Sequence, residues 1–440
     1  MNFARSLVPF IAPQMQLPVA PMVLDSLFRR SLFEGADIAA LEREIADYVG
    51  VRHAICFSSA RYGLYLLYRF FQCQNKSVWL PAYTCIPAAD ALRWAGAKPF
   101  FLDISADDYN PLFPTEPPPP EHCGAICLSY LYGLVGDIQP FLDFARSNHI
   151  PVIEDAAIAL GAEYRGKKVG SLGDAGVFSL QSSKIITAWR GGVVTTNRDD
   201  VANFLRAEQK RGRFPSLAKV LFNVILTRTR RLLSIPATYG WTLHLAKRLV
   251  LSDTWQPLAQ RLLDQNPAEA LTGQGPESPG AADRARFTNL QARLTRRALE
   301  HIEAILAVRR ASAARYREAF STLPGVVCPS EADGIQNTYG RFPIRLPGRS
   351  KADLEKMFLD AGIEIGLYYP YVIPDTPSFL QEPADEYDVP NARRASMETV
   401  LLPMHTGLRG PDVDKVIATV LKIAELSQRS EGLPSTSQEH

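Results

Sequence analysis

A regular pattern of apolar and polar positions starts at residues 36–49, where apolar residues recur at the spacing of one helix face. Gly50 follows directly, and glycine commonly ends a helix. Short apolar runs then alternate with helical stretches as far as about residue 205. These runs are 53–57, 77–81, 98–104, 124–130, 151–155, 175–180 and 191–197. Strands of this length separated by helices predict a mostly parallel sheet with helices on both faces.

The pattern changes after about residue 205, in a segment that is basic as well as apolar. Residues 206–261 contain eleven Lys or Arg residues and two acidic ones. Residues 216–235 and 240–251 place Leu, Phe or Trp beside Lys and Arg, which is typical of amphipathic helices. A stretch rich in Pro and Gly, 266–283, closes this segment like a loop.

A long helical pattern resumes at residue 286, and a smaller α/β unit follows it. This unit has a strand at 341–346, a helix at 351–362 and a last helix from Asp412. The final dozen residues have the composition of a disordered tail.

A chain of 440 residues exceeds one ordinary core, so two or three domains are expected. The patterns suggest a large domain over 1–205, a basic helical insertion over 206–285, and a long helix with a small domain over 286–440. The apolar stretch at the start is broken by Pro9 and Pro13, and it is too short for a signal sequence or a membrane span. We therefore expect a cytoplasmic protein.

Charge and cysteine content narrow the functional classes. The net charge of +2 gives no whole-chain argument for nucleic-acid binding, so no nucleic-acid partner is expected. Cys123 and Cys127 are four residues apart, but no matching His or Cys pair follows them, so no metal site is expected. The chain has no CxxC pair, and free thiols fit a reducing compartment.

Two ionisable residues stand where a parallel sheet binds ligands. Asp155 ends an apolar strand, and ligands bind at the carboxyl ends of strands in open sheets; a helix N-cap explains its position equally well. Lys184 lies between two strands, where partial removal from water favours a reactive amine; an ordinary solvated lysine is the alternative. Together they match pyridoxal phosphate (PLP), which needs an amine for its aldehyde and a carboxylate for its pyridine nitrogen.

The third requirement of PLP is a site for its phosphate. Residues 58–71 form a small-residue turn that opens a helix directly after the strand 53–57. Backbone N–H groups at a helix N-terminus favour an anion. Ser58 and Ser59 are also good N-cap residues, and on position alone the cap is the preferred interpretation.

Residues 153–197 closely resemble the core motif of the DegT/DnrJ/EryC1/StrS aminotransferases. Further blocks of resemblance follow the family order, at 81–104, 286–292, 365–371 and 391–405. The resemblance implies a fold-type-I, PLP-dependent transferase that works as a homodimer with active sites at the subunit interface. It also implies that an amino-acid donor, commonly glutamate, gives its amino group to a keto-sugar linked to a nucleotide, in polysaccharide or natural-product biosynthesis.

The resemblance also implies roles for matching positions. Lys184 corresponds to the Schiff-base lysine, Asp155 to the partner of the pyridinium nitrogen, and Ser179 to a phosphate-binding serine. Ser59 and the backbone after it correspond to the phosphate-binding turn. After its release from the cofactor, Lys184 would move a proton between the substrate α-carbon and the cofactor.

Several positions depart from the family pattern around the cofactor. Ala60 and Arg61 replace the Gly-Thr of the phosphate turn, so Arg61 either adds a phosphate contact or points away. Cys85 replaces an aromatic residue that can stack on the ring. Tyr83 would project from the same face if its strand continues, and it is our candidate for this stacking role.

Further departures concern polar contacts. Ile158 stands where the family has a Gln beside the phenolic oxygen, Arg190 where it has a Glu, and Tyr130 where it has a His. Arg284 aligns with an Asn that is donated across the dimer. We expect Arg284 and Arg286 to reach the cofactor region of the neighbouring subunit.

These departures leave three hypotheses. The first is an aminotransferase acting on a keto-sugar or a similar ketone. The second is another PLP-dependent reaction on a non-sugar or lipid-linked ketone, and the third is a catalytically silent protein with this fold. Related dehydrases replace the lysine with histidine, so Lys184 favours transamination, and the pair of Lys184 and Asp155 argues against a silent protein.

The basic segment suggests a further partner. Its cations and large apolar residues predict contact with a peripheral membrane surface or a lipid-linked substrate through 206–261. The simpler interpretation is a helical hairpin that packs on its own dimer.

Overall fold

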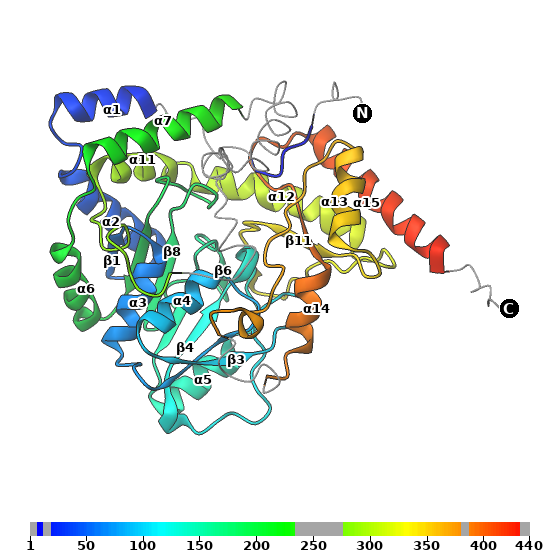
Figure 1. The fold of residues 1–440 in the computed structure, drawn as a ribbon, viewed down its shortest axis with the longest axis horizontal. Helices are drawn as coiled ribbons and strands as arrows, with labels where there is room; N and C mark the ends of the chain where they lie inside the picture. Colours follow the sequence, from blue (N-terminus) through cyan, green and yellow to red (C-terminus); the bar gives the residue numbers. More distant parts are fainter. Residues whose placement is uncertain (1–6, 12–18, 234–275, 380–386, 432–440) are drawn as a thin grey trace.

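The computed structural model describes residues 7–11, 19–233, 276–379 and 387–431 (Figure 1). The predicted helix at 240–251 and most of the tail lie outside the described residues, as does the first part of the predicted loop at 266–283. The described residues form a larger α/β part and a smaller C-terminal part.

A seven-stranded sheet forms the centre of the larger part. Its strands are β1 (His53–Phe57), β2 (Ser77–Pro81), β3 (Lys98–Leu102), β4 (Cys123–Ser129), β5 (Val152–Asp155), β8 (Ala175–Ser179) and β9 (Gly192–Thr196). The order is β1-β9-β8-β5-β4-β2-β3. The five strands from β8 to β3 are parallel, and β9 is antiparallel to both of its neighbours. The prediction of a mostly parallel sheet is confirmed.

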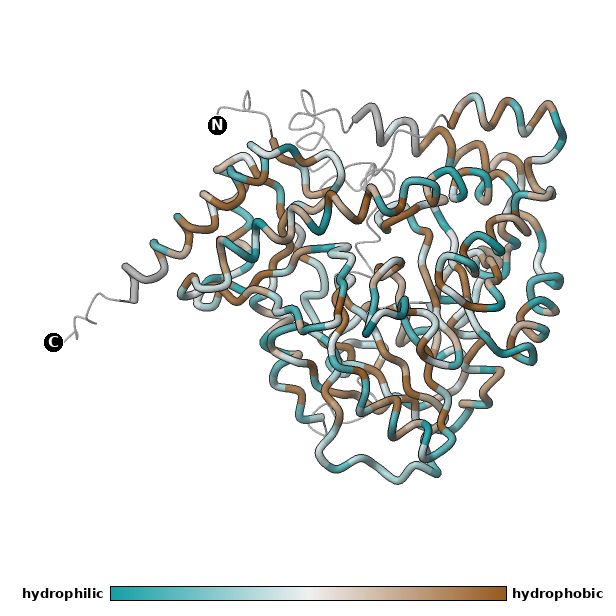
Figure 2. The backbone as a smooth tube through the Cα atoms, turned by 180° about the vertical axis from the view of Figure 1, so that it is seen from behind, coloured by the Kyte–Doolittle hydropathy of each residue, from teal (hydrophilic) through white to brown (hydrophobic). Residues whose placement is uncertain are grey.

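Helices cover both faces of this sheet, so its strands are apolar on both sides. In β4, Ala125 and Cys127 belong to one core cluster, whereas Ile126 and Leu128 belong to the other. The first cluster includes side chains of α3 (Ala60–Phe70), α4 (Ile86–Trp94) and α6 (Asp199–Arg211). The second includes side chains of α2 (Ala36–Val49) and α5 (Gln139–Asn148). Figure 2 shows these apolar strands inside the larger part, with hydrophilic stretches toward the outside.

The long helix predicted from residue 286 is two helices, α11 (Asn289–Leu299) and α12 (Ile302–Phe320). Thr288 and Gln291 form a capping box that starts α11. The two helices are separated at His301, whose φ of −114° and ψ of 11° are not helical. The break lets α11 pack against α2 in the larger part while α12 packs against α15 (Gly410–Glu431) in the smaller part.

The smaller part contains the predicted strand and helices together with elements that the sequence pattern did not predict. Strand β11 (Phe342–Arg345) pairs antiparallel with β12 (Thr399–Leu402), and α13 (Lys351–Asp360) and α14 (Pro390–Glu398) flank this pair. A three-stranded sheet of β6 (Glu163–Tyr164), β7 (Lys167–Lys168) and β10 (Ile335–Gln336) joins the two parts. Residues 7–11 pair with the smaller part through Val8 and Ile363, although the pattern assigned them to the large domain.

A third layer lies on α11. Helices α1 (Val19–Phe28) and α7 (Leu217–Leu233) lie side by side at this end of the molecule (Figure 1). They share a small apolar cluster with α11, built around Val23, Val220, Val224, Leu290 and Leu294. The helix predicted at 216–235 is therefore confirmed over most of its length.

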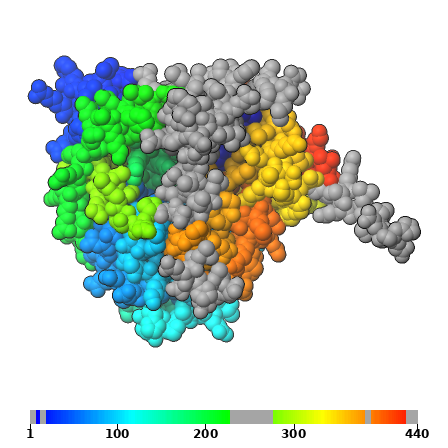
Figure 3. Space-filling model, in the orientation of Figure 1, coloured from blue at the N-terminus to red at the C-terminus, as the bar shows by residue number. Residues whose placement is uncertain are grey.

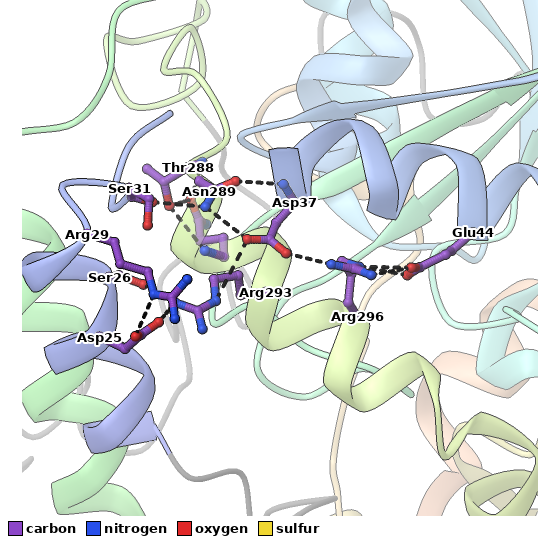
Figure 4. A network of polar contacts seen from close by, with 11 residues as sticks. Asp25, Ser26, Arg29, Ser31, Asp37, Glu44, Thr288, Asn289, Arg293 and Arg296 are labelled. Carbon is purple, nitrogen blue, oxygen red and sulfur yellow. Dashed lines mark hydrogen bonds and ion pairs between the residues drawn. The ribbon is translucent and has the colours of Figure 1, made fainter. Parts of the chain in front are cut away.

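Polar contacts fasten α11 to its neighbours (Figure 4). Arg296 binds Glu44 on α2 with a shortest distance of 2.7 Å, and Arg293 binds Asp25 on α1 at 2.8 Å. Asn289 accepts a hydrogen bond from the Asp37 N–H at 3.0 Å. Partly exposed ion pairs each contribute only about 0–1 kcal/mol, so this network mainly sets the orientation of the three helices.

Among the described residues, none of the helices combines the length and apolar character that crossing a membrane requires. The same residues contain no group of three or more His, Cys, Asp or Glu placed to hold a metal ion.

Candidate active site

Polar side chains meet at the carboxyl edge of the sheet, where β2, β4 and β5 end. Thr84 follows β2, and its hydroxyl lies 2.8 Å from the Ser129 hydroxyl at the end of β4. Ser129 donates to Asp155 Oδ2 at 3.4 Å, and the Ala157 N–H donates to Asp155 Oδ1 at 3.3 Å. Parallel strands bring their carboxyl ends to one edge, so these side chains form a chain that holds the Asp155 carboxyl.

Asp155 is 6% exposed, and burial raises the pKa of its carboxyl. The charge of Lys184 and the hydrogen bonds from the Ala157 N–H and the Ser129 hydroxyl lower this pKa. The Lys184 charge therefore lies within electrostatic range of Asp155, and the two predicted residues come together. Residues 156–162 form turns and no helix, so the interpretation of Asp155 as a helix N-cap is wrong.

Cys85 lies in the same group. It directly precedes α4. Burial raises the pKa of its thiol; the charge of Lys184 lowers this pKa, and the charge of Asp155 raises it. Tyr369, which has a positive φ of 53°, forms a hydrogen bond with Cys85. Cys85 is therefore a direct neighbour of the predicted cofactor residues.

Tyr83 occupies a different environment. We expected Tyr83 to share a face with position 85 if strand β2 continued that far. Strand β2 ends at Pro81, so this alternation of faces does not extend to Tyr83. Its side chain is fully buried, and its hydroxyl lies 2.9 Å from that of Tyr132. Its ring also packs edge-on against Tyr369, with centroids 6.0 Å apart. Tyr83 thus packs against Tyr369, and its stacking on a cofactor ring stays a prediction.

The predicted phosphate turn is the N-terminus of α3. Ser59 is the N-cap, and its hydroxyl accepts a hydrogen bond from the Tyr62 N–H at 3.2 Å. The backbone at Ala60 is approached so closely by Gly192 that a Cβ on Gly192 would lie 2.3 Å from Ala60 N. Ser179 ends β8, the neighbour of β9, at the same edge of the sheet. The turn therefore has the backbone of a helix N-terminus that suits a phosphate.

Arg61 is directed at α4. Its Nη1 lies 3.5 Å from Asp90 Oδ2, and its guanidinium lies 5.5 Å from the centre of the Trp94 ring. Its positive charge also lowers the pKa of the Cys85 thiol. These contacts agree with the alternative in which Arg61 points away from the phosphate, although a phosphate contact stays a prediction.

The turn at 280–284 lies against the phosphate turn of its own chain. Arg190 Nη2 binds Asp283 Oδ1 at 2.8 Å, and the Ser58 hydroxyl donates to the Asp283 carbonyl. The positive charge of Arg284 lowers the pKa of the Tyr62 hydroxyl on α3, so the two side chains lie near each other. Arg286 binds Glu34 at 3.3 Å and packs over Phe214 at 4.1 Å, all within one chain. Contact of Arg284 or Arg286 with a neighbouring subunit stays a prediction.

Two other departures from the family pattern have local structural explanations. A Cβ on Gly340 would lie 2.3 Å from Ile158 Cγ1, so Ile158 fills the space that Gly340 leaves open. The Tyr130 hydroxyl donates to the buried Glu154 carboxylate at 2.9 Å. Glu154 also accepts the Gly170 N–H at 2.8 Å, so Tyr130 helps to satisfy a buried charge.

Sequence reasoning missed Thr84, Ser129, Tyr369 and Arg341. Ser129 ends a strand beside Asp155, so the rule that identified Asp155 would have identified it as well. Arg341 had no such signal, because its Nη2 donates to the carbonyl of Ser183 across 158 positions in the sequence, at 2.9 Å.

The sequence profile of the DegT/DnrJ/EryC1/StrS aminotransferase family matches residues 19–241 and 268–421. The chain belongs to this family. It is 35% identical to a GDP-perosamine synthase of Caulobacter vibrioides over 247 residues, which cover 54% of this chain and 67% of that protein. It is 28% identical to a pleiotropic regulatory protein of Geobacillus stearothermophilus, over 93% of this chain and 94% of the relative.

Solved structures of aminotransferases have a similar fold. PseC of Helicobacter pylori, an aminotransferase involved in the biosynthesis of pseudoaminic acid, has a TM-score of 0.74 at 20% identity, over 96% of this chain and 100% of PseC. DesV of S. venezuelae, solved with a ketimine intermediate, has a TM-score of 0.72 at 21% identity, over 96% of this chain and 99% of DesV. At this identity the likeness establishes the fold.

This family is PLP-dependent, and the residues of this member fit that cofactor. Asp155 is a buried carboxylate with hydrogen-bond donors, suited to a pyridinium nitrogen. Lys184 is within electrostatic range, and the α3 N-terminus provides backbone for a phosphate. The close approach at Gly192 keeps the α3 turn against the sheet.

Proposed function

We propose that this protein is a PLP-dependent aminotransferase that moves an amino group from an amino acid to a nucleotide-linked keto-sugar, for polysaccharide or natural-product biosynthesis. The observation that carries the proposal is the pairing of Lys184 with buried Asp155 at the carboxyl edge of the sheet. The GDP-perosamine synthase among its relatives supports a sugar substrate.

Asp155 and Lys184 have different roles in the proposed reaction. Bound here, PLP supplies an electron sink for negative charge that develops at the substrate α-carbon. Asp155, held by Ser129 and the Ala157 N–H, keeps a proton on the ring nitrogen. The Lys184 amine would serve as the base that takes a proton from the substrate α-carbon and as the acid that gives a proton back. Cys85 and Tyr369, which are only partly exposed, would limit the access of water to the reacting atoms.

A two-stage experiment tests this function. The purified protein, loaded with PLP, is first mixed with glutamate, and the cofactor absorbance and the release of 2-oxoglutarate are followed. Conversion of the cofactor to its amine form is expected, followed by return to the aldehyde form when a nucleotide-linked keto-sugar is added. If glutamate does not convert the cofactor, the other amino acids are added in turn. Failure of all of them would contradict aminotransfer and favour another PLP-dependent reaction.

A second proposal concerns location. Six of the ten exposed large apolar side chains among the described residues lie on α1 and α7, and Figure 3 shows both helices at one corner of the surface. They are Leu24, Leu27, Phe28, Leu217, Phe222 and Ile225. An apolar surface beside a basic segment fits the headgroup region of an anionic membrane. We propose that the α1/α7 surface docks there and holds the enzyme at the membrane.

A further inference from the structure

Lys184 lies in a loop with little regular structure of its own. Residues 181–190, which the structure describes in full and which we call the Lys184 loop, contain no helix or strand. The Lys184 N–H donates to the carbonyl of Gln181 at 3.0 Å, a bond within one turn of this loop. Such a local bond does not fix where the loop lies relative to Asp155 on β5. The position of the loop therefore depends on contacts with other parts of the chain.

Arg341, the residue before β11, supplies such a contact from the smaller part. Its Nη2 donates to the carbonyl of Ser183, the residue before Lys184, at 2.9 Å. The Arg341 side chain carries a positive charge and the residue is 4% exposed. A hydrogen bond from a charged donor is stronger than a neutral one, and more so away from water. This bond therefore holds the backbone beside Lys184 against the smaller part.

The chain just before Arg341 also holds the turn that follows Asp155. The Thr338 hydroxyl donates to the carbonyl of Ile158, three positions beyond Asp155, at 3.0 Å. A Cβ on Gly340 would lie 2.9 Å from the same oxygen atom, so the two backbones are in close contact. One stretch of chain thus contacts the backbone beside both candidate cofactor residues, which lets it set the distance between them.

Residues 7–11 help to fix the orientation of the Arg341 guanidinium. The centre of the Phe10 ring lies 5.5 Å from this guanidinium, and that of the Tyr368 ring lies 5.9 Å from it. Aromatic rings at these distances attract a cation and restrict its plane. The Phe10 N–H donates to Glu364 Oε2 at 2.9 Å, which fastens the N-terminal segment to the smaller part.

Arg341 is unfavourable at its position if stability alone is considered. Arg309, on α12, is fully buried, and both arginines donate to the carbonyl oxygen of Gly340, from Arg309 Nη1 at 3.1 Å and from Arg341 Nη1 at 2.6 Å. Burial and the Arg341 charge lower the pKa of Arg309 to about 9, so Arg309 remains a cation at neutral pH. Like charges buried side by side repel each other, and a neutral residue at position 341 would remove this cost.

We propose that Arg341 is a positioning residue, which sets the place of the Lys184 amine relative to Asp155 by holding the Ser183 carbonyl. The N-terminal segment 7–11 is part of its support. The proposal rests on the proposed function for the role of Lys184, whereas the contact with the Lys184 loop is measurable without turnover. A displacement of about 1 Å in an active site can lower a rate on the order of 100-fold, so a single backbone contact can matter for catalysis.

Hydrogen exchange of the full chain, measured with and without PLP, tests the contact directly. In Arg341→Gln, the amides of the Lys184 loop should exchange roughly 10- to 100-fold faster than in the wild type, the effect of losing one charge-assisted hydrogen bond. The urea midpoint of unfolding should stay the same or rise, because the repulsion with Arg309 is removed. An arginine with only a structural role would instead lower the urea midpoint.

The kinetics provide a second readout. In Arg341→Gln, the visible cofactor band should form more slowly on addition of PLP, and kcat with glutamate should fall roughly 10- to 100-fold. The KM for glutamate should change little, because Arg341 acts through the loop and not on the substrate. Arg341→Lys keeps a charged donor and should restore part of both the rate and the slow exchange.

Arg345→Gln is the matched control, because Arg345 is 5% exposed and donates to a carbonyl outside the loop, that of Ala106, at 2.7 Å. Its Lys184 loop should exchange as in the wild type. Unchanged exchange of this loop in folded Arg341→Gln would overturn the proposal, and so would equally fast exchange in Arg345→Gln.

Phe10→Ala keeps the proposal testable if Arg341→Gln does not fold. This change removes one flanking ring but leaves the charge of Arg341 in place, and it should speed exchange of the Lys184 loop several-fold. Unchanged exchange in Phe10→Ala would overturn the role of the N-terminal segment. Faster loop exchange in Arg341→Gln, in a protein whose wild type never converts its cofactor, would contradict the proposed function alone.

Discussion

The Asp155 carboxyl is buried, but it accepts hydrogen bonds from the Ser129 hydroxyl and the Ala157 N–H, and this suits it to hold the ring nitrogen of PLP. Asp155→Asn should still bind PLP, but its turnover should fall roughly 100-fold, equivalent to about 2.7 kcal/mol, because an amide cannot keep the ring nitrogen protonated. Steady-state rates and cofactor absorbance measure both effects. Asp143→Asn, an exposed change on α5, is the control. A rate near that of the wild type in Asp155→Asn would show that the carboxyl has no role in catalysis.

Single residues of the site were predictable where a local rule existed. The end of an apolar strand identified Asp155, and a loop between two strands identified Lys184, and the structure brings them together. Tyr83 was less predictable because its role depended on where β2 ends, which is set by packing. Arg341 reaches the Lys184 loop only through the tertiary fold, which no local pattern encodes.

At the scale of elements, the approach of β9 to α3 has a testable consequence. Gly192→Ala places a Cβ 2.3 Å from Ala60 N, so the N-terminus of α3 must move. We expect the dissociation constant for PLP to rise roughly tenfold, about 1.4 kcal/mol, as phosphate contacts are lost. A fluorescence titration measures it. Gly410→Ala, where the nearest atom is 3.9 Å away, should bind PLP normally, and equal affinity in both variants would contradict the role of the turn.

The α1/α7 surface supplies a second prediction at this scale. Flotation with liposomes should show binding that requires anionic lipid and weakens with salt. Phe28→Ser combined with Ile225→Ser should reduce binding several-fold, because these side chains are 90% and 63% exposed. Met397→Ser, at 64% exposure on α14, is the matched control. Absence of binding to anionic vesicles at low salt would end the proposal and favour packing within a dimer.

Most elements followed from the period of apolar residues, because buried strands and amphipathic helices have distinct patterns. The exceptions have physical causes. The break at His301 lies within a continuous helical pattern, since each half of that pattern has its own packing partner. The short strand pairs β6–β7 and β10–β6 contain only two residues per strand, too few for a period to be detected.

At the scale of the whole molecule, the family implies an active site completed by two subunits. We predict that activity is lost as the protein dissociates, because Arg284 and Arg286 would no longer reach the neighbouring cofactor. Sedimentation velocity at assay concentrations, combined with rate measurements over a dilution series, tests this. The fraction of dimer should account for the rate at each concentration. A fully active monomer would refute the shared site.

We infer that Lys184 holds the cofactor, and chemical trapping of the bound cofactor is the most direct test. The protein loaded with PLP is treated with borohydride, digested, and mapped by mass spectrometry. We expect a pyridoxyl phosphate mass on Lys184, and loss of both that mass and the visible cofactor band in a folded Lys184→Ala variant. A label on another lysine, such as Lys167 or Lys168, or an equally intense trapped band in Lys184→Ala, would contradict it.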